Sequence, residues 1–364
     1  MASANKKRGR RIGVFVGAAV AGLAAGAAIE RAAVGRIRSR PDPEAREPFG
    51  SLRGTSIGPV ASFDGTLLNV EEAGHGPTVI LAHGYSLNLT LWHYQIRDLA
   101  SRYRLVLFDQ RGHGRSEPAR RGGWTMDALA RDLDAVVQAS GDGPVVLVGH
   151  SMGGMALLNY CSLFRETLGE RVAGVVLVDT TSADVMPGMI EFLPRRITAA
   201  FQGVQEVALR AVAGLDRASV DKMRRRANDL SWMLVRAMGF GPNASPSHVA
   251  FVEKMLSETT VDTWLELLPN VTGVDVTETL PHIDVPALVI VGTRDRLTPP
   301  GAAERMVKGI PNATLGKIAG AGHCPMLESP HTFNARLRAF LDAIPGFGVR
   351  GAGTATLEEP SEAS

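Results

Sequence analysis

The segment Gly149-His150-Ser151-Met152-Gly153 has the residue types and spacing of a nucleophile site for acyl transfer. It follows the apolar run 145–148, which is typical of a buried strand, and precedes an apolar stretch of helical length. In a tight turn from strand to helix, the two glycines leave room for the backbone, and the hydroxyl of Ser151 is held exposed. The start of the following helix favours negative charge beside that hydroxyl. The sequence therefore predicts Ser151 as a nucleophile, with Gly149 and Gly153 as supporting residues.

A serine nucleophile needs a base, and the base needs a group that orients it. His323 follows the last apolar run of the chain, and Asp295 follows the run before it. Both would then lie after the carboxyl ends of strands, the edge at which open α/β sheets bind their ligands. We predict a catalytic triad of Ser151, Asp295 and His323. Asp179 also ends an apolar run, so it stays open as an alternative carboxylate.

The negative charge that develops on an attacked carbonyl oxygen needs backbone N–H donors. One donor is expected from Met152, directly after the nucleophile, and the other from Tyr85 in the segment His83-Gly84-Tyr85. Gly84 would let this backbone turn toward the site. We interpret His83 as a support of the loop by hydrogen bonding, because it lies on the wrong segment to act as the base.

Short apolar runs alternate with longer amphipathic ones over most of the chain. This alternation predicts an α/β fold with a mostly parallel sheet and helices on both faces. Buried strands are expected at 78–84, 103–110, 144–150, 172–180, 285–293 and 313–320, after a hairpin around Asp64-Gly65. Helices are expected at 91–101, 125–140, 151–165, 300–309 and 330–343.

The interval 185–284 breaks the alternation, because it contains helical patterns and no convincing strand. A hundred residues are too long for a plain connection, so we interpret them as a helical cap inserted into the core. The chain is predicted to divide into a membrane anchor or signal segment at 1–35, a linker at 36–57, an α/β core at 58–184 and 285–343, the cap at 185–284 and a disordered tail at 344–364.

The net charge of +2 hides an uneven distribution. Residues 1–40 hold nine Lys or Arg and one acid, whereas the remainder has thirty basic and thirty-six acidic side chains. A mildly acidic body argues against nucleic-acid binding. The stretch 12–29 has no charge and is barely long enough to span a membrane, with basic residues on both sides. It predicts a single anchor of uncertain orientation, or a signal peptide that is cleaved on export.

From about residue 58 to 343 the chain resembles the α/β-hydrolase superfamily, close to its esterases, cofactor-free haloperoxidase-like enzymes and carbon–carbon bond hydrolases. The motifs that carry the resemblance are AHGYS (82–86), DQRGHGRS (109–116), GHSMGG (149–154), GTRD (292–295) and GAGH (320–323), in family order. The resemblance implies that DQRGHGRS is mainly structural, and that Trp92 and Gln95 help to build the entrance and the first helix. A serine at position 151 argues against the dehalogenase and epoxide hydrolase relatives, which need a carboxylate nucleophile.

These features predict a serine hydrolase that cleaves apolar carboxylic esters through an acyl-enzyme. The alternatives left open are a perhydrolase or haloperoxidase-like enzyme, a carbon–carbon bond hydrolase with the same triad, and a hydrolase-fold ligand-binding protein with little turnover. No metal-ligand spacing or phosphate loop is present, so no metal or cofactor is expected. The expected partners are a small apolar acyl substrate and, through the N-terminal segment, a membrane; a homo-oligomer stays open.

Overall fold

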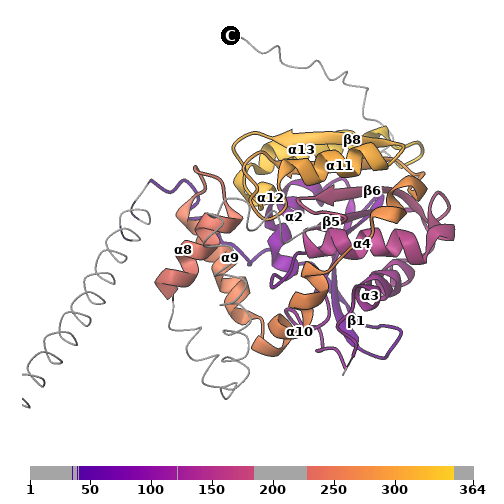
Figure 1. Ribbon diagram of the computed structural model, residues 1–364, viewed down its shortest axis with the longest axis horizontal. Helices are drawn as coiled ribbons and strands as arrows, with labels where there is room; N and C mark the ends of the chain where they lie inside the picture. Colours follow the sequence, from indigo (N-terminus) through magenta and orange to yellow (C-terminus); the bar gives the residue numbers. More distant parts are fainter. Residues whose placement is uncertain (1–34, 36–38, 40, 121, 184–227, 348–364) are drawn as a thin grey trace, which may run out of the picture.

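The structure of the protein is a computed structural model that describes residues 35, 39, 41–120, 122–183 and 228–347 (Figure 1). Across these residues one sheet has the strand order β1-β2-β4-β3-β5-β6-β7-β8. The pairs β1–β2 and β2–β4 are antiparallel, and every pair from β4 to β8 is parallel. The strands are β1 (Thr55–Ala61), β2 (Leu67–Ala73), β3 (Thr78–Ala82), β4 (Arg104–Phe108), β5 (Val145–His150), β6 (Val172–Val178), β7 (Ala287–Gly292) and β8 (Ala313–Ile318). The expected fold class is confirmed.

Helices cover both faces of the sheet. The helices of the core are α2 (His93–Leu99), α3 (Met126–Ala139), α4 (Met152–Leu163), α11 (Pro300–Gly309), α12 (Pro325–Glu328) and α13 (Pro330–Ala343). Short 3-10 helices lie at η1 (Leu89–Trp92), η2 (Arg165–Thr167) and η3 (Thr277–His282). The expected helices 300–309 and 330–343 begin and end where predicted, and the other three are each shorter by two or more residues.

The pleat of the central strands divides the core into two apolar layers. In β5, Val146 and Val148 face the layer of α2 and α13, whereas Val145 and Leu147 face the layer of α3 and α4. Every residue of β5 is buried, which explains why this strand reads as a continuous apolar run. The central strands are thus rigidly held, and so are the side chains that follow their carboxyl ends.

The strand register places the predicted site residues at one edge of the sheet. Ala82 pairs with Gly149, and His150 pairs with Val178. Val178 in turn pairs with Ile290. Because neighbouring parallel strands end together, the loops after β3, β5, β6, β7 and β8 open onto the same edge.

The described part of the predicted cap contains α8 (Asn228–Gly239), α9 (Pro246–Glu258) and α10 (Val261–Thr272). Thr260 caps α10 by accepting the Thr263 N–H, and Ser245 does the same for His248 in α9. The return to the core comes earlier than residue 284, because Leu280 and Ile283 lie in the core layer of α4 and α11. A β-bridge joins Ala183 to Asp275, so the ends of the insertion meet there. Residues 185–227 of the predicted cap lie outside the described residues.

The predicted linker differs from the structure in its described part. The core sheet begins at Thr55 rather than at residue 58. Before it, Glu47 lies 2.7 Å from His93 Nε2 of α2, and Phe49 stacks on Phe251 of α9 at 4.9 Å between ring centroids. Glu44 also accepts the hydroxyl of Tyr94 at 2.7 Å. Residues 42–53 therefore join the core to the cap instead of forming a plain tether.

Most residues at the two ends of the chain lie outside the described part of the structure. They include the whole of the stretch 12–29, which is predicted to be an anchor or signal segment. Within the ranges that the structure describes, no helix is long and apolar enough to cross a membrane. At the other end, Ile344 and Phe347 of the predicted tail are buried in the core layer of α13, so the tail starts later than expected.

Candidate active site

Ser151 occupies the turn between β5 and α4 in a backbone conformation that is rare for a side-chain-bearing residue, with φ 52° and ψ −119°. Its N–H donates to Val178 O at 2.9 Å, and its carbonyl accepts the Thr180 hydroxyl at 2.7 Å. Such conformations cost about 1–3 kcal/mol and persist only where the surroundings impose them. The turn is thus held in a strained shape that presents the serine at the edge of the sheet.

The two predicted supporting glycines are required by close backbone approach. A Cβ on Gly149 would lie 2.5 Å from Gly153 O, and a Cβ on Gly153 would lie 2.5 Å from Ala82 O. The loop after β3 is also close, because a Cβ on Gly84 would lie 3.2 Å from Ser151 Cβ. Glycine at these positions allows the nucleophile turn to pack directly against the predicted oxyanion loop.

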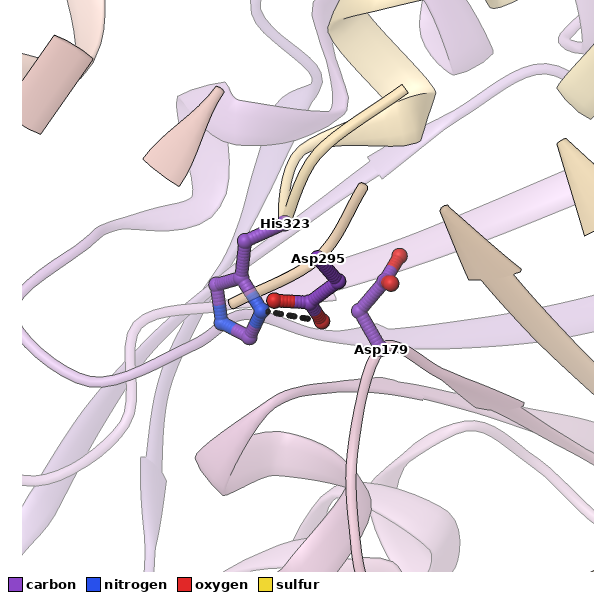
Figure 2. Close-up of side chains that lie close together, drawn as sticks. All are labelled: Asp179, Asp295 and His323. Atoms are coloured by element: carbon purple, nitrogen blue, oxygen red, sulfur yellow. Dashed lines mark hydrogen bonds and ion pairs between the residues drawn. The ribbon is translucent and has the colours of Figure 1, made fainter. Parts of the chain in front are cut away.

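His323 and Asp295 are brought together as predicted. His323 Nδ1 lies 2.9 Å from Asp295 Oδ2, and the carboxylate side chain is fully buried (Figure 2). Asp295 also accepts the Thr298 hydroxyl at 2.6 Å and the N–H groups of Leu297 and Thr298 at 2.8 and 3.2 Å. Burial by itself would raise the pKa of Asp295, but His323 and the Thr298 hydroxyl hold it below its ordinary value. Asp295 is therefore a carboxylate that orients the ring of His323.

The imidazole of His323 and the hydroxyl of Ser151 come from the loops after β8 and β5, and they do not hydrogen-bond to each other in the described structure. The link between the two segments runs through His150, whose Nε2 donates to His323 O at 2.8 Å. Burial and the nearby His323 lower the pKa of His150 to about 3, so this ring is neutral. Catalytic contacts are often long without substrate and shorten when it binds.

Asp179, the alternative carboxylate, lies on the other side of Asp295 from His323 (Figure 2). It makes no hydrogen bond to His323 and instead accepts the Gly292 N–H at 2.9 Å. The three groups lie within 4.8 Å of one another, and together they have the residue types of a metal site. Asp295 Oδ2 accepts the N–H of His323 Nδ1 and the Thr298 hydroxyl, contacts that fit a carboxylate that orients the ring.

The predicted oxyanion donors lie on either side of the nucleophile turn. Met152 is the first residue of α4, and the N–H groups of a first helical turn have no acceptor within the helix. Tyr85 follows Gly84 in the loop packed against Ser151, and its hydroxyl donates to Trp264 O in α10. Met152 also packs in one apolar cluster with Leu267 of α10. The cap helix α10 is therefore fixed to both of the predicted oxyanion segments.

His83 makes two hydrogen bonds around the predicted oxyanion loop. Its Nδ1 donates to Gly84 O at 2.8 Å, and its Nε2 accepts the Gln110 N–H at 3.0 Å. Burial lowers the pKa of His83 to about 4, so the ring stays neutral.

The motif 109–116 braces the same loop. Asp109 accepts the Leu89 N–H at 2.8 Å, and His113 Nε2 accepts the Ser86 N–H at 3.0 Å. These contacts give the motif a positioning role.

The expectation that Trp92 and Gln95 help to build an entrance needs correction, because both side chains are fully buried. Trp92 ends η1 and lies 6.5 Å from Phe333 of α13 between ring centroids, and Gln95 Nε2 of α2 donates to Asn334 Oδ1 at 2.8 Å. They build the first helix but do not line an entrance.

Sequence reasoning also missed Glu328, whose two oxygens accept the N–H groups of Gly241 and Gly322 at 2.7 Å each. In the sequence, only its position five residues after His323 indicated that Glu328 lies near the site. Glu328 ties the cap to the histidine loop.

A cavity of about 440 Å³ opens between α8 and the loop that carries Asp295. Its lining combines Trp232 and Phe240 with Arg236, Arg294 and Arg296. Arg296 donates to Ala237 O at 2.8 Å, which ties the loop to α8. The lining contains none of the three triad residues, so the cavity lies beside the triad rather than over it.

Residues 77–330 match the family model described as "alpha/beta hydrolase fold". The chain is a member of the α/β-hydrolase superfamily. It is 31% identical over 299 residues to a non-heme haloperoxidase of Rhodococcus erythropolis, covering 78% of this chain and 99% of the relative. A thermophilic esterase from Thermogutta terrifontis has a similar structure, with a TM-score of 0.63 and 25% identity over 80% of this chain and 98% of its own.

The α/β-hydrolase also matches part of a much larger protein. It is 29% identical over 281 residues to a polyketide synthase of Burkholderia thailandensis, covering 76% of this chain but only 12% of the synthase. The relatives together support a hydrolase function, because they include esterases and haloperoxidases of the same fold.

Proposed function

We propose that this α/β-hydrolase cleaves apolar carboxylic esters through an acyl-enzyme on Ser151. The observation that carries the proposal is the strained Ser151 turn, which His150 ties to the loop of His323, together with the Nδ1 of that imidazole held 2.9 Å from a buried carboxylate. A nucleophile, a base and an orienting acid on loops at one edge of the sheet are the parts that acyl transfer by serine requires.

In the proposed first step, His323 Nε2 takes the proton of the Ser151 hydroxyl while Ser151 Oγ attacks the ester carbonyl carbon. The N–H groups of Met152 and Tyr85 would stabilise the oxyanion. His323 then gives its proton to the leaving alcohol oxygen, and the acyl-enzyme forms. Asp295 stabilises the imidazolium and keeps the proton of neutral His323 on Nδ1, so that Nε2 is free to act as the base.

In the second step, water attacks the acyl-enzyme and loses a proton to His323 Nε2. The tetrahedral intermediate collapses, the proton returns to Ser151 Oγ, and the carboxylic acid leaves. Apolar residues of α4 and α10, among them Met155 and Leu267, pack beside the oxyanion segments. This apolar surrounding supports an apolar acyl group.

The test is hydrolysis of p-nitrophenyl esters of graded acyl length by Ser151→Ala, with Ser101→Ala as the matched control. Ser101 is exposed and lies between α2 and β4, at the opposite edge of the sheet. Ser151→Ala should lower kcat by at least about 10³-fold, and Ser101→Ala should not. A Ser151→Ala protein with the wild-type rate would overturn the assignment.

The protein for this assay should begin at residue 41, because Asp42, Glu44, Glu47 and Phe49 contact the core or the cap. Labelling of Ser151 by a fluorophosphonate, measured on the same protein, addresses the ligand-binding alternative. A folded protein that binds ligand but takes up no label at Ser151 would favour that alternative.

Perhydrolysis is a second candidate activity of the same site, favoured by the similarity to the Rhodococcus haloperoxidase. In this reaction, hydrogen peroxide takes the place of water in the attack on the acyl-enzyme, and a peracid leaves. Bromination of monochlorodimedone that needs acetate, bromide and peroxide, and that Ser151→Ala abolishes, would support it. Carbon–carbon bond cleavage stays a further alternative with the same triad.

We further propose that the uncharged stretch 12–29 attaches the enzyme to a membrane. The support is its length, its lack of charge and the basic residues that flank it. Retention of the full-length protein in membranes after carbonate washing would support an anchor. Recovery of a shortened soluble form would indicate signal cleavage instead.

A further inference from the structure

Asp179 is a buried acid that the proposed reaction does not use. It follows β6 with φ 39°, in the left-handed region, and is 1% exposed. Its Oδ1 accepts the Gly292 N–H, whereas its buried Oδ2 has no hydrogen-bond partner. A buried carboxylate oxygen without a donor is costly if the group is ionised. The strained backbone and the unpartnered oxygen both make Asp179 unusual for a buried, ionised carboxylate.

The surroundings of Asp179 contain more acids than bases. Asp295 faces it from the loop after β7, Glu328 contributes from α12, and His323 and Cys324 lie in the loop after β8. His150, beside His323, is neutral. Of the two aspartates, Asp295 accepts four hydrogen bonds and Asp179 accepts one. The donors thus favour negative charge on Asp295.

Two carboxyl groups this close in a buried site cannot both ionise without a large cost, so one of them keeps a proton. Burial, and then the neighbouring Asp295, raise the pKa of Asp179 well above its usual range. The hydrogen bonds and the charges point the same way, to a neutral Asp179.

We propose that Asp179 and Asp295 together hold a single proton, that it resides on Asp179 Oδ2, and that the neutral Asp179 donates a hydrogen bond to Asp295. Asp179 is then a positioning residue, because it acts on His323 through Asp295. The proposal rests on the proposed function only for the role of the Asp295–His323 pair. The proton on Asp179 stays there throughout turnover. The imidazolium of His323 therefore faces one negative charge, that of Asp295, rather than two.

The test measures the pKa of His323 by NMR titration of its ring, and the acid limb of kcat/KM for ester hydrolysis. The variants are Asp179→Asn, which keeps a neutral donor of the same shape, and Asp179→Ala, which removes it. Asp142→Asn is the control, because Asp142 is exposed and precedes β5 at the opposite edge of the sheet. Circular dichroism and thermal unfolding would verify that each variant is folded.

With neutral Asp179, Asp179→Asn should leave the pKa of His323 within ~0.3 unit of wild type. Asp179→Ala should raise it by about one unit, because Asp295 loses a donor and becomes more basic. If Asp179 were ionised, Asp179→Asn would instead lower it by about two units, the effect of a unit charge within ~5 Å at an effective dielectric of 20.

A fall of that size in Asp179→Asn would overturn the proposal, and so would an Asp179→Ala protein whose His323 titrates as in wild type. The ring titration can also be carried out in a Ser151→Ala background, where turnover does not matter. An active Ser151→Ala protein would refute the proposed function without affecting this measurement. The two failures are therefore distinguishable.

Discussion

Replacing Asp295 with asparagine should disable the base without disturbing the fold. Asp295 Oδ1 accepts two backbone N–H groups, from Leu297 and Thr298, so the carbonyl oxygen of an asparagine would take that place. The amide N–H₂ would then face His323 Nδ1. Because an N–H donor at that position needs an acceptor, His323 would carry its proton on Nε2. The imidazole could then no longer accept the proton of Ser151.

The charge lost on this change sets the size of the effect. Opposite unit charges at the observed 2.9 Å attract each other by about 6 kcal/mol at an effective dielectric of 20. Since each 1.36 kcal/mol corresponds to a factor of ten in rate, kcat/KM should fall by about 10⁴-fold. Both side chains are almost fully buried, so solvent screens this attraction little.

The assay is kcat/KM for p-nitrophenyl esters, with the rate of fluorophosphonate labelling as a second measure of Ser151 reactivity. Thr298→Val is the matched control, because it removes one donor to Asp295 Oδ2 and leaves the charge in place. We expect Thr298→Val to lose about ten-fold. An Asp295→Asn enzyme that loses less than Thr298→Val would refute the view that Asp295 fixes the tautomer and stabilises the imidazolium.

Three further changes test the parts that hold the site. Gly153→Ala should destabilise the fold by about 1–3 kcal/mol in urea unfolding, because its Cβ would meet the backbone oxygen of Ala82 at 2.5 Å. Gly143→Ala is the control, because a Cβ there meets no atom within 4 Å. Phe49→Ala should lower the free energy of unfolding by about 1–2 kcal/mol through lost ring contacts with α9, and an unchanged midpoint would contradict the docking of residues 42–53. Burial raises the pKa of Glu328 to about 7, above its ordinary value of 4.5. The folded protein therefore binds this proton more tightly than the unfolded chain, and the resulting stabilisation is complete only below pH 4.5. The free energy of unfolding should therefore fall by about 3 kcal/mol between pH 4.5 and 7 relative to Glu328→Gln, and parallel pH curves for the two proteins would count against this.

Local pattern was sufficient to predict most of the α/β core. The apolar runs at β3, β5 and β7 are short and β-branched, and each is buried on both faces, so the sequence of each strand reports its own environment. The boundaries of the insertion were less predictable. Leu280 and Ile283 look like further helical residues in the sequence, and only the packing of this segment against α4 and α11 assigns them to the core.

The contacts of residues 42–53 could not be predicted from their composition. A stretch rich in Pro, Arg and Glu has no hydrophobic period, yet Phe49 and the carboxylates of Glu44 and Glu47 find partners on α2 and α9. Those partners lie about 50 and 200 positions away in the chain. Local sequence contains no information about such distant neighbours.

The sequence by itself determined the nucleophile turn, because its glycines are needed for close backbone contacts around Ser151. It also indicated His323 as the base and limited the orienting acid to Asp295 or Asp179, through their places after strands. Tertiary structure alone decided which acid faces His323. Asp179 and Asp295 both follow buried strands and are chemically identical, so no local pattern separates them. The register of β6, β7 and β8 places Asp295 Oδ2 at 2.9 Å from the ring and leaves Asp179 behind it, where burial and the adjacent charge favour a neutral acid.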